Sequence, residues 1–180
     1  MRSLLHRIDE KHITDECFYA CIEITKGSKN KYEYDEEMDA LVLDRILFTS
    51  TIYPHNYGFI PKTWGLDDDP LDVLVISSEP IVPLALVKSK PIGVLEMLDG
   101  GKSDEKIIAV PLGDPFFSSY DDLVELPGHV IDEIKHFFKV YKQLEFGKST
   151  NVEGFKSKEK AKEIMRNAKE RYHLKFKEEQ

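Results

Sequence analysis

Alternating apolar and polar positions run through the first two thirds of the chain and are typical of short β-strands. Six such stretches are separated by segments rich in turn residues: FYACIEI, KYEYD, ALVLDRIL, DVLVIS, PIGVLEML and KIIAVPL. No helical crossover lies between them to cover both faces of a parallel sheet. The pattern therefore predicts a mainly antiparallel sheet that curls into a small barrel over about residues 15–115.

The period of the pattern changes after Pro127. Apolar residues then recur at helical spacing, namely Val130, Ile134, Phe137, Phe138, Tyr141 and Leu144. A second helix is predicted from an N-cap at Ser157 to about Tyr172, with a narrow apolar stripe and a charged face that we expect in solvent. The predicted fold class is α+β, mainly β, with two amphipathic helices outside the barrel in a helical part over about 119–175.

Length and charge narrow the range of functions. The 180 residues fit one domain, 1–180, and 25 basic against 33 acidic residues leave a formal charge of −8. This charge would repel a phosphate backbone, so we expect no nucleic-acid partner.

Cys17 and Cys21 lie four strand positions apart, about 13 Å, which is too far for a disulfide. No apolar run approaches the roughly 18 residues of a membrane span, so we expect a cytoplasmic protein with no membrane partner.

The stretch WGLDDDPLDVLV places four aspartates between residues 67 and 72. A turn accounts for the first three, but Asp72 falls inside an apolar strand, where burial without a partner costs several kcal/mol. A cation would compensate it, and carboxylate oxygens suit Mg²⁺ or Mn²⁺. An EF-hand would need Gly at Asp72 and Glu at Ser78, and Pro70 followed by VLVI favours a strand over the helix that carries the similar DDxxD motif of isoprenyl diphosphate synthases.

A second acidic loop, MLDGGKSDEKII, carries Asp99 and Asp104, although its residues are also ordinary for a hairpin turn. The GGKS and GKST stretches do not fit a phosphate-binding loop, because Glu96 and Lys142 stand where that motif needs glycine. Basic and phenolic side chains that could bind a polyanionic phosphate are spread along the chain: Lys31, Arg45, Tyr53, Tyr57, Lys106, Tyr141 and Lys142. Each alone is typical of a surface or a core, and only the set indicates phosphate chemistry.

Taken in order, these stretches resemble the family I soluble inorganic pyrophosphatases over nearly the whole chain. The most specific match is DDDPLDVLV, and IEI, KYE, DR, YPHNYGFIP, DGGKSDEK, HFFKVYKQLE and VEGF follow the family's order and spacing. The resemblance implies a five-stranded OB-like barrel with peripheral helices. It also implies Mg²⁺-dependent hydrolysis of pyrophosphate to two phosphates by direct attack of a metal-activated water, with no covalent enzyme intermediate.

The resemblance also assigns roles to single residues. Asp67, Asp72 and Asp104 correspond to the main metal ligands, Asp99 to a further ligand, and Glu23 and Glu33 to outer or additional ones. Asp69 corresponds to the base that assists deprotonation of the attacking water. The phosphate-holding groups correspond to Lys31, Arg45, Tyr57, Tyr141 and Lys142, with Lys106 and Tyr53 in support.

Three positions depart from the family pattern. Asp68 stands where glycine is most frequent, and Asn151 and Phe155 replace a lysine and a tryptophan. The compact length resembles the bacterial members, which are typically hexamers, whereas the eukaryotic members are longer and dimeric; a homo-oligomer, and a hexamer in particular, is therefore expected. Two alternatives stay open, namely a barrel that binds divalent ions or phosphometabolites without turnover, and hydrolysis of a nucleoside or prenyl diphosphate.

Overall fold

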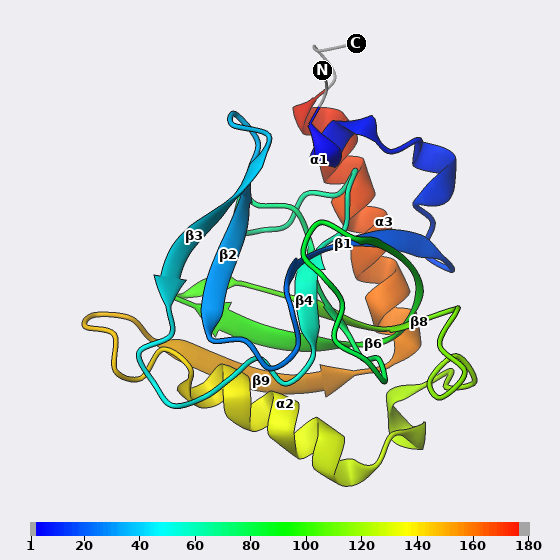
Figure 1. Ribbon diagram of the computed structural model, residues 1–180. Helices are drawn as coiled ribbons and strands as arrows, with labels where there is room; N and C mark the ends of the chain where they lie inside the picture. The colour runs from blue at the N-terminus through cyan, green and yellow to red at the C-terminus, as the bar shows by residue number, and fades with distance from the viewer. Residues whose placement is uncertain (1–2, 177–180) are drawn as a thin grey trace.

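The chain folds into a mainly β structure with few helices, and the computed structural model describes residues 3–176 (Figure 1). Its strands are β1 (Phe18–Ile24), β2 (Asn30–Asp35), β3 (Ala40–Ile46), β4 (Asn56–Phe59), β5 (Asp72–Val75), β6 (Leu86–Asp99), β7 (Lys102–Ser103), β8 (Lys106–Pro111) and β9 (Thr150–Lys156). Its α-helices are α1 (Leu4–Arg7), α2 (Gly128–Val140) and α3 (Lys158–Lys175), with 3₁₀ turns at Glu10–His12 and Leu123–Glu125.

The larger sheet follows the order β1–β4–β5–β8–β6, and β6 also pairs with β1, so the pairing returns to its first strand. Every pair along this path is antiparallel except β5 and β8, which run parallel. The long strand β6 also carries β7 and β9, while β2 and β3 form a separate two-stranded sheet. The mainly antiparallel prediction is thus confirmed, with β5–β8 as the one parallel pair among the described strands.

Strands β5 and β8 read as continuous apolar runs because both of their faces are buried. Successive side chains of a strand point to opposite faces. Leu74 accordingly joins the apolar cluster that contains the buried side chains of α2, whereas Val73 and Val75 join the cluster that contains those of α3. The two clusters fix β5 from both sides, and this rigid strand begins at Asp72.

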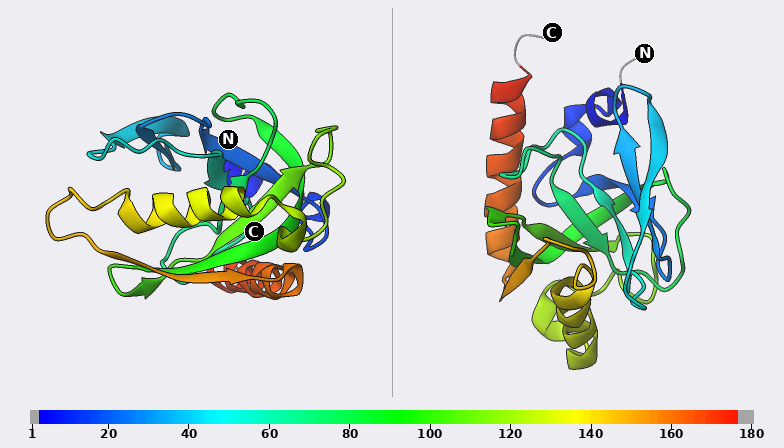
Figure 2. Two further views of the ribbon diagram at one scale, coloured as in Figure 1. Left: turned by 90° about the horizontal axis from the view of Figure 1, so that it is seen from below. Right: turned by 90° about the vertical axis from the view of Figure 1, so that its left-hand side faces the viewer.

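The two long helices flank β6 and β9 from opposite sides, as Figure 2 shows. On α2, Ile134, Phe137 and Phe138 are buried as predicted. The helix ends earlier than its apolar pattern suggests: Tyr141 is the C-cap and Leu144 lies beyond it, 67% exposed. The prediction that Leu144 continues the buried stripe was therefore wrong.

Helix α3 begins as predicted at Ser157, whose side chain accepts a hydrogen bond from Lys160 N. Its predicted stripe is buried through Ala161, Ile164, Ala168 and Tyr172. The opposite face is not simply solvated. Lys162 pairs with Glu16 at 2.6 Å and Arg166 with Asp15 at 2.5 Å, so charged residues of α3 hold the segment that leads into β1.

All six predicted strands are present, but three further strands escaped prediction, and one of them, β7, has only two residues. Strand β4 is a four-residue piece inside a stretch dominated by turn residues, and β9 lies within the part that was expected to be helical. Cys17 and Cys21 are free thiols, in agreement with their predicted separation. Among residues 3–176, no helix combines the length and apolar character needed to cross a membrane.

Candidate functional site

A cavity of about 500 Å³ opens where the ends of the large sheet meet β2. Its wall includes all of the predicted site residues except Arg45 and Tyr53. The fold thus brings together side chains from the acidic loop before β5, the loop before β8, the strands β1, β2 and β4, and the end of α2. Acidic groups and basic or phenolic groups share this one space.

Asp67, Asp72 and Asp104 form the acidic centre of the cavity. Each offers a carboxylate oxygen, and these three oxygens lie within 4.8 Å of one another. Asp72 starts β5 and Asp104 precedes β8, so the parallel pairing of these strands sets two of the three carboxylates side by side. A set made only of carboxylate oxygens fits a hard divalent cation such as Mg²⁺ or Mn²⁺.

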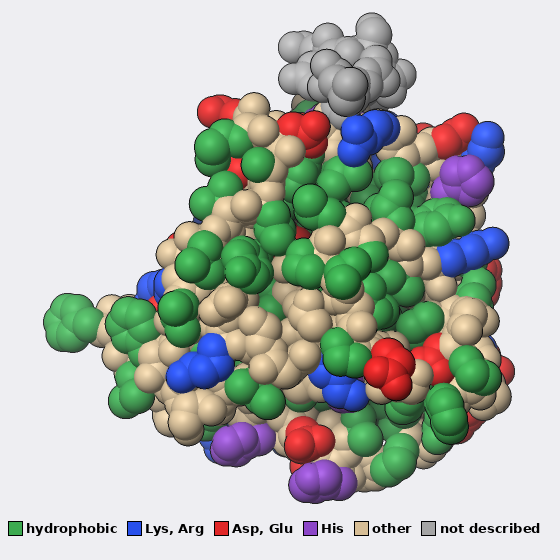
Figure 3. Space-filling model, viewed as in Figure 1, with side chains coloured by type: hydrophobic (Ala, Val, Ile, Leu, Met, Phe, Trp, Pro, Cys, Tyr) green, Lys and Arg blue, Asp and Glu red, His purple; other side chains and the backbone are tan. Residues whose placement is uncertain are grey.

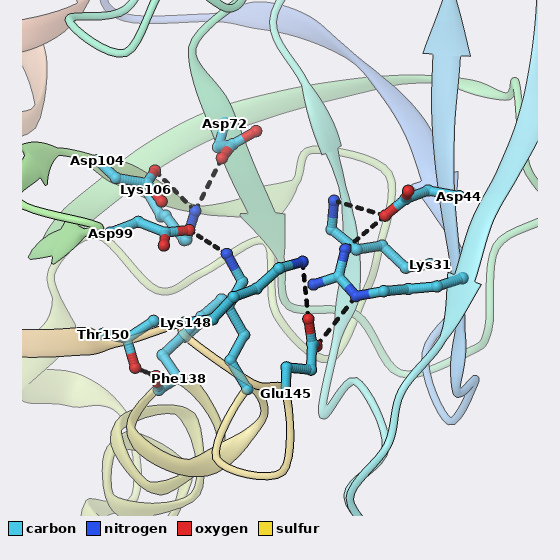
Figure 4. A network of polar contacts seen from close by, with 12 residues as sticks. Lys31, Asp44, Asp72, Asp99, Asp104, Lys106, Phe138, Glu145, Lys148 and Thr150 are labelled. Atoms are coloured by element: carbon cyan, nitrogen blue, oxygen red, sulfur yellow. Dashed lines mark hydrogen bonds and ion pairs between the residues drawn. The ribbon is translucent and has the colours of Figure 1, made fainter.

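Lys106 is the buried counter-charge of this cluster. Its side chain is 2% exposed, and its ammonium donates hydrogen bonds to Asp72 Oδ2 and Asp104 Oδ1, both at 2.8 Å (Figure 4). It also donates to the Tyr57 hydroxyl at 2.9 Å. Burial alone would lower the pKa of Lys106, but Asp72 and Asp104 hold it well above its ordinary value. Tyr57 in turn donates to Asp72 Oδ2 at 2.5 Å. Asp72 is therefore fixed by two donors as well as by its strand.

Three carboxyl groups of the cavity, those of Asp67, Asp69 and Glu23, have raised pKa values. Burial, and then repulsion by Asp72 and Asp104, raises the pKa of Asp67 to about 7. Partial burial of its carboxyl group also raises the pKa of Asp69, and repulsion by Asp72 is the second cause. Asp69 nevertheless keeps an exposed surface. Burial likewise raises the pKa of Glu23 to about 8. Such shifts are typical of a site in which a cation must compete with protons.

Strands β1 and β2 supply the wall opposite the acidic loop. Glu23 accepts a hydrogen bond from Tyr34 N at 2.7 Å, which ties β1 to β2. Lys31 and Glu33 stand two positions apart on β2, so they point to the same face. Their side chains form an ion pair there, and Lys31 Nζ also lies 3.8 Å from Asp44.

The end of α2 contributes the third wall. Tyr141, the C-cap of α2, is 4% exposed, and Lys142 is the next residue after the helix ends. Lys142 forms an ion pair with Asp99 at the end of β6, so the predicted ligand Asp99 is paired with a predicted phosphate-binding group. Burial raises the pKa of the Tyr141 hydroxyl, which therefore stays protonated as a hydrogen-bond donor.

Arg45 lies outside the cavity wall, held by an ionic network on β3 and the segment after α2 (Figure 4). Its guanidinium pairs with Asp44 and donates from Nε to Glu145 at 3.0 Å, and Glu145 also pairs with Lys148 at 2.8 Å. The Arg45 Nη2 atom is buried and has no hydrogen-bond partner among residues 3–176. An unsatisfied cationic donor of this kind suits an incoming anion.

Tyr53 is also absent from the cavity wall. It is 1% exposed, and its ring lies 5.3 Å from Tyr57 and 4.7 Å from Phe137, measured between centroids. Its position fits support of Tyr57 by packing rather than direct contact with a ligand.

The cavity wall also includes residues that the sequence did not single out, among them Tyr34, Asp35 and Trp64. Strand alternation places Asp35 on the same face of β2 as Glu33 and is one signal for it, but it gives no signal for Tyr34, which lies at the opposite parity and also lines the cavity. Trp64 opens the acidic loop and is the chain's single tryptophan, but nothing in its sequence context indicates which way the ring points.

The backbone explains one departure from the family pattern. Asp68 has a φ of +74°, in the left-handed region that glycine enters without cost. Aspartate tolerates this region better than most residues, so the acidic loop keeps its shape. Asn151 and Phe155 lie on β9, opposite Leu98 and Leu95 of β6, and neither lines the cavity.

Comparison with known proteins agrees with this geometry. Residues 20–173 match the sequence profile of the inorganic pyrophosphatase family. The inorganic pyrophosphatase of Halalkalibacterium halodurans is 50% identical over 153 residues, which cover 85% of this chain and 93% of that protein. The soluble inorganic pyrophosphatase 2 of Chlamydomonas reinhardtii is 47% identical over 156 residues, covering 86% and 81%. The solved inorganic pyrophosphatase of Helicobacter pylori superimposes with a TM-score of 0.89 at 41% identity, covering 93% of this chain and 99% of that one.

Proposed function

The chain belongs to the inorganic pyrophosphatase family and is an inorganic diphosphatase, and we propose that it hydrolyses pyrophosphate to two orthophosphates with Mg²⁺ by direct attack of water. The observation that carries this proposal is the cluster of Asp67, Asp72 and Asp104 oxygens within 4.8 Å, in a cavity also lined by Lys31, Lys142, Tyr57 and Tyr141. Such a cavity can take both a divalent cation and a polyanion.

Asp67, Asp72 and Asp104 would hold the metal, with Asp99, Glu23 and Glu33 as further or outer carboxylates. Bound there, Mg²⁺, or alternatively Mn²⁺, supplies Lewis-acid chemistry: it lowers the pKa of water and neutralises charge on phosphate oxygens. The fully carboxylate donor set and the raised pKa of Asp67 support this assignment, because a cation relieves the repulsion that the three acids share.

Asp69 is the proposed general base. It stands between Asp67 and Asp72 in the chain, its backbone N lies 3.4 Å from Asp67 Oδ1, and it lines the cavity. The pKa of Asp69 is raised toward neutral pH, and a general base is most effective when its pKa lies near the pH at which it works. Asp69 would accept a proton from the attacking water as the water oxygen bonds to one phosphorus, the bridging P–O bond breaks and the second phosphate leaves, so no enzyme side chain becomes phosphorylated.

The basic and phenolic groups are proposed to bind the two phosphates. Lys31, Arg45 and Lys142 neutralise their charge, as a phosphoryl transfer that builds charge on the leaving group requires. Tyr141 donates a hydroxyl hydrogen bond, and Tyr57 would do so by turning its O–H, which donates to Asp72 in this structure, to a phosphate oxygen. Lys106 and Tyr53 support this arrangement, the first by fixing Asp72 and Asp104 and the second by packing on Tyr57.

The test is phosphate release by the purified protein with pyrophosphate and Mg²⁺, repeated with EDTA and with Mn²⁺. We expect rapid release with Mg²⁺ that the chelator abolishes. A panel of nucleoside and prenyl diphosphates under the same conditions tests substrate choice, and calorimetry tests binding. Pyrophosphate binding without phosphate release would contradict the catalytic proposal, and faster release from an organic diphosphate would contradict the substrate.

We further propose a cytoplasmic homohexamer built from single-domain subunits of 1–180, whose five cyclically paired strands form an OB-like barrel. Free thiols at Cys17 and Cys21 support a reducing compartment. Apolar side chains spread over the face seen in Figure 3, and Ile46, Phe48 and Ile52 are 54%, 59% and 49% exposed, which supports burial against other copies. Sedimentation at the 20.8 kDa monomer mass would contradict the assembly.

A further inference from the structure

The acidic loop from Trp64 to Pro70 is closed at its base by buried hydrogen bonds. Thr63 donates from its hydroxyl to Ile60 O at 2.5 Å and accepts from Leu71 N at 3.0 Å, and Ile60 N donates to Leu71 O at 2.9 Å. These buried bonds hold the two ends of the loop together. They do not set the direction in which the loop, with Asp67 and Asp69, projects from the sheet.

That direction is set by α3, which lies beside the loop in Figures 1 and 2. Trp64 N donates to Ala168 O at 2.9 Å, and Arg171 Nε donates to Trp64 O at 2.8 Å. The Lys175 ammonium lies 3.8 Å from the centre of the Trp64 ring. One turn of α3, from Ala168 to Arg171, thus forms hydrogen bonds with both backbone polar groups of Trp64, and Lys175 in the next turn packs against the Trp64 ring.

Movement of Trp64 would pass directly to the metal-binding carboxylates. Gly65 N donates to Asp69 O at 2.6 Å, and a Cβ placed on Gly65 would come within 2.6 Å of Asp67 Oδ1. Gly65 therefore packs directly against the Asp67 carboxylate and forms a hydrogen bond with the Asp69 backbone, and no space remains between them. A shift of the Trp64 carbonyl cannot be absorbed before it reaches these two acids.

We propose that Arg171 is a positioning residue for the acidic loop, and that α3 through this guanidinium sets the affinity of the site for divalent cations. The inference rests on the proposed function of the loop as a metal site. Arg171 does not line the cavity. It acts through Trp64 and Gly65 on Asp67, whose oxygen must lie at a fixed distance from those of Asp72 and Asp104 for one cation to reach all three.

The experiment measures Mg²⁺ binding by calorimetry, without pyrophosphate, in the full chain and in Arg171→Met, Arg171→Lys and Arg166→Met. Outer supports of metal ligands are worth about 10- to 100-fold in affinity, so Arg171→Met is expected to weaken Mg²⁺ binding about tenfold while kcat at saturating Mg²⁺ changes little. Arg171→Lys, which keeps one donor and the charge, should recover part of the affinity. Arg166→Met removes a guanidinium from the same helix that pairs with Asp15 and not with the loop, so wild-type affinity is expected.

Trp64 gives a second readout, because it is the single tryptophan of the chain. Its emission in the absence of metal should differ between Arg171→Met and the wild type, and not between Arg166→Met and the wild type. Equal Mg²⁺ affinities for wild type and Arg171→Met would overturn the inference, and so would an equal loss in Arg166→Met. Failure of the wild type to bind Mg²⁺ would instead overturn the proposed metal site, so the two failures are distinguishable.

Discussion

Lys106 and Asp72 face each other across the parallel strands β8 and β5, and the Lys106 ammonium lies 2.8 Å from Asp72 Oδ2. The same ammonium lies 2.8 Å from Asp104 Oδ1, so a fixed cation already neutralises part of the acidic cluster. Strand register, rather than a flexible loop, keeps this charge in place. The protein can therefore hold converging carboxylates in its fold before any metal binds.

Replacing Lys106 by methionine should lower the free energy of unfolding of the metal-free protein, measured in EDTA. The change leaves Asp72 and Asp104 partly buried without their cation, and breaking a buried pair in this way costs about 3–5 kcal/mol. Urea unfolding in EDTA at neutral pH measures the loss, and added Mg²⁺ should restore part of it, since it binds only the folded cluster.

Lys90→Met is the matched control for this lysine. Its partner Asp121 has a side chain that is 62% exposed, and a surface pair of this kind is worth at most about 1 kcal/mol. A loss in Lys106→Met no larger than that in Lys90→Met would contradict the role of Lys106 as the counter-charge of the cluster.

Asp69→Asn should lower the rate of pyrophosphate hydrolysis by about 10²- to 10⁴-fold, the usual contribution of a general base. The amide keeps the size of the side chain and removes its proton-accepting charge. Asp68→Asn is the control, because Asp68 is the neighbouring exposed acid and does not line the cavity. Steady-state phosphate release at saturating Mg²⁺ compares the two, and similar losses in both would mean that the motif has been misread.

The raised pKa of Asp67 predicts that stability falls as pH rises. In the folded, metal-free protein this pKa is about 7, against an ordinary value of 3.8. At a pH between 3.8 and about 7 the folded state therefore binds more protons than the unfolded state. Under that condition the free energy of unfolding decreases with increasing pH. The destabilising contribution is absent below about pH 4 and complete above about pH 7.

Urea unfolding in EDTA at pH 5 and pH 8 tests this sign. Asp67→Asn cannot ionise, so its stability relative to the wild type should increase from pH 5 to pH 8. Mg²⁺ should reduce the difference, because a bound cation favours the ionised carboxylate. A relative stability that stays constant with pH would contradict the raised pKa.

Local pattern predicted most of the fold, and it failed where an element was short or depended on distant partners. DVLVIS could be read as a buried strand because its apolar run follows Pro70, and Ser157 could be read as a helix start. Strand β9 could not be read in this way. Its half-buried positions lose their alternation after Gly154, whose φ is +142°, and it becomes a strand only by pairing with β6.

The site follows the same logic. The crowding of Asp67 and Asp72 in the sequence indicated a compensating charge, whereas Asp104 was assigned only through the resemblance to the family. The pair of Arg45 and Glu145 could not, since these residues are 100 positions apart and only the fold brings them together. Resemblance to a family supplied the names of the phosphate-binding residues but not the supports behind them.

Glu145→Gln should raise KM for pyrophosphate more than it lowers kcat. Glu145 is 6% exposed and orients the Arg45 guanidinium through Nε at 3.0 Å, which leaves Nη2 free for an anion. Loss of one charged hydrogen bond of about 1.5 kcal/mol corresponds to about a tenfold weaker hold on the phosphate. Lys148→Gln removes the other, more exposed partner of Glu145 and should have a smaller effect. Steady-state kinetics at fixed free Mg²⁺ separates KM from kcat, and a larger effect of Lys148→Gln would contradict the role given to Glu145.

Gly65→Ala should weaken Mg²⁺ binding without unfolding the protein. The added Cβ would lie 2.6 Å from Asp67 Oδ1 and 3.1 Å from Asp69 O, so the Asp67 side chain must rotate away from its present place. Because that side chain is one of the proposed ligands, we expect about a tenfold or greater loss of affinity, comparable to removal of a supporting contact. Gly113→Ala is the control, since a Cβ there meets no atom within 4 Å. Calorimetric titration with Mg²⁺ compares the variants, and equal affinities would show that Asp67 does not depend on the space that Gly65 leaves.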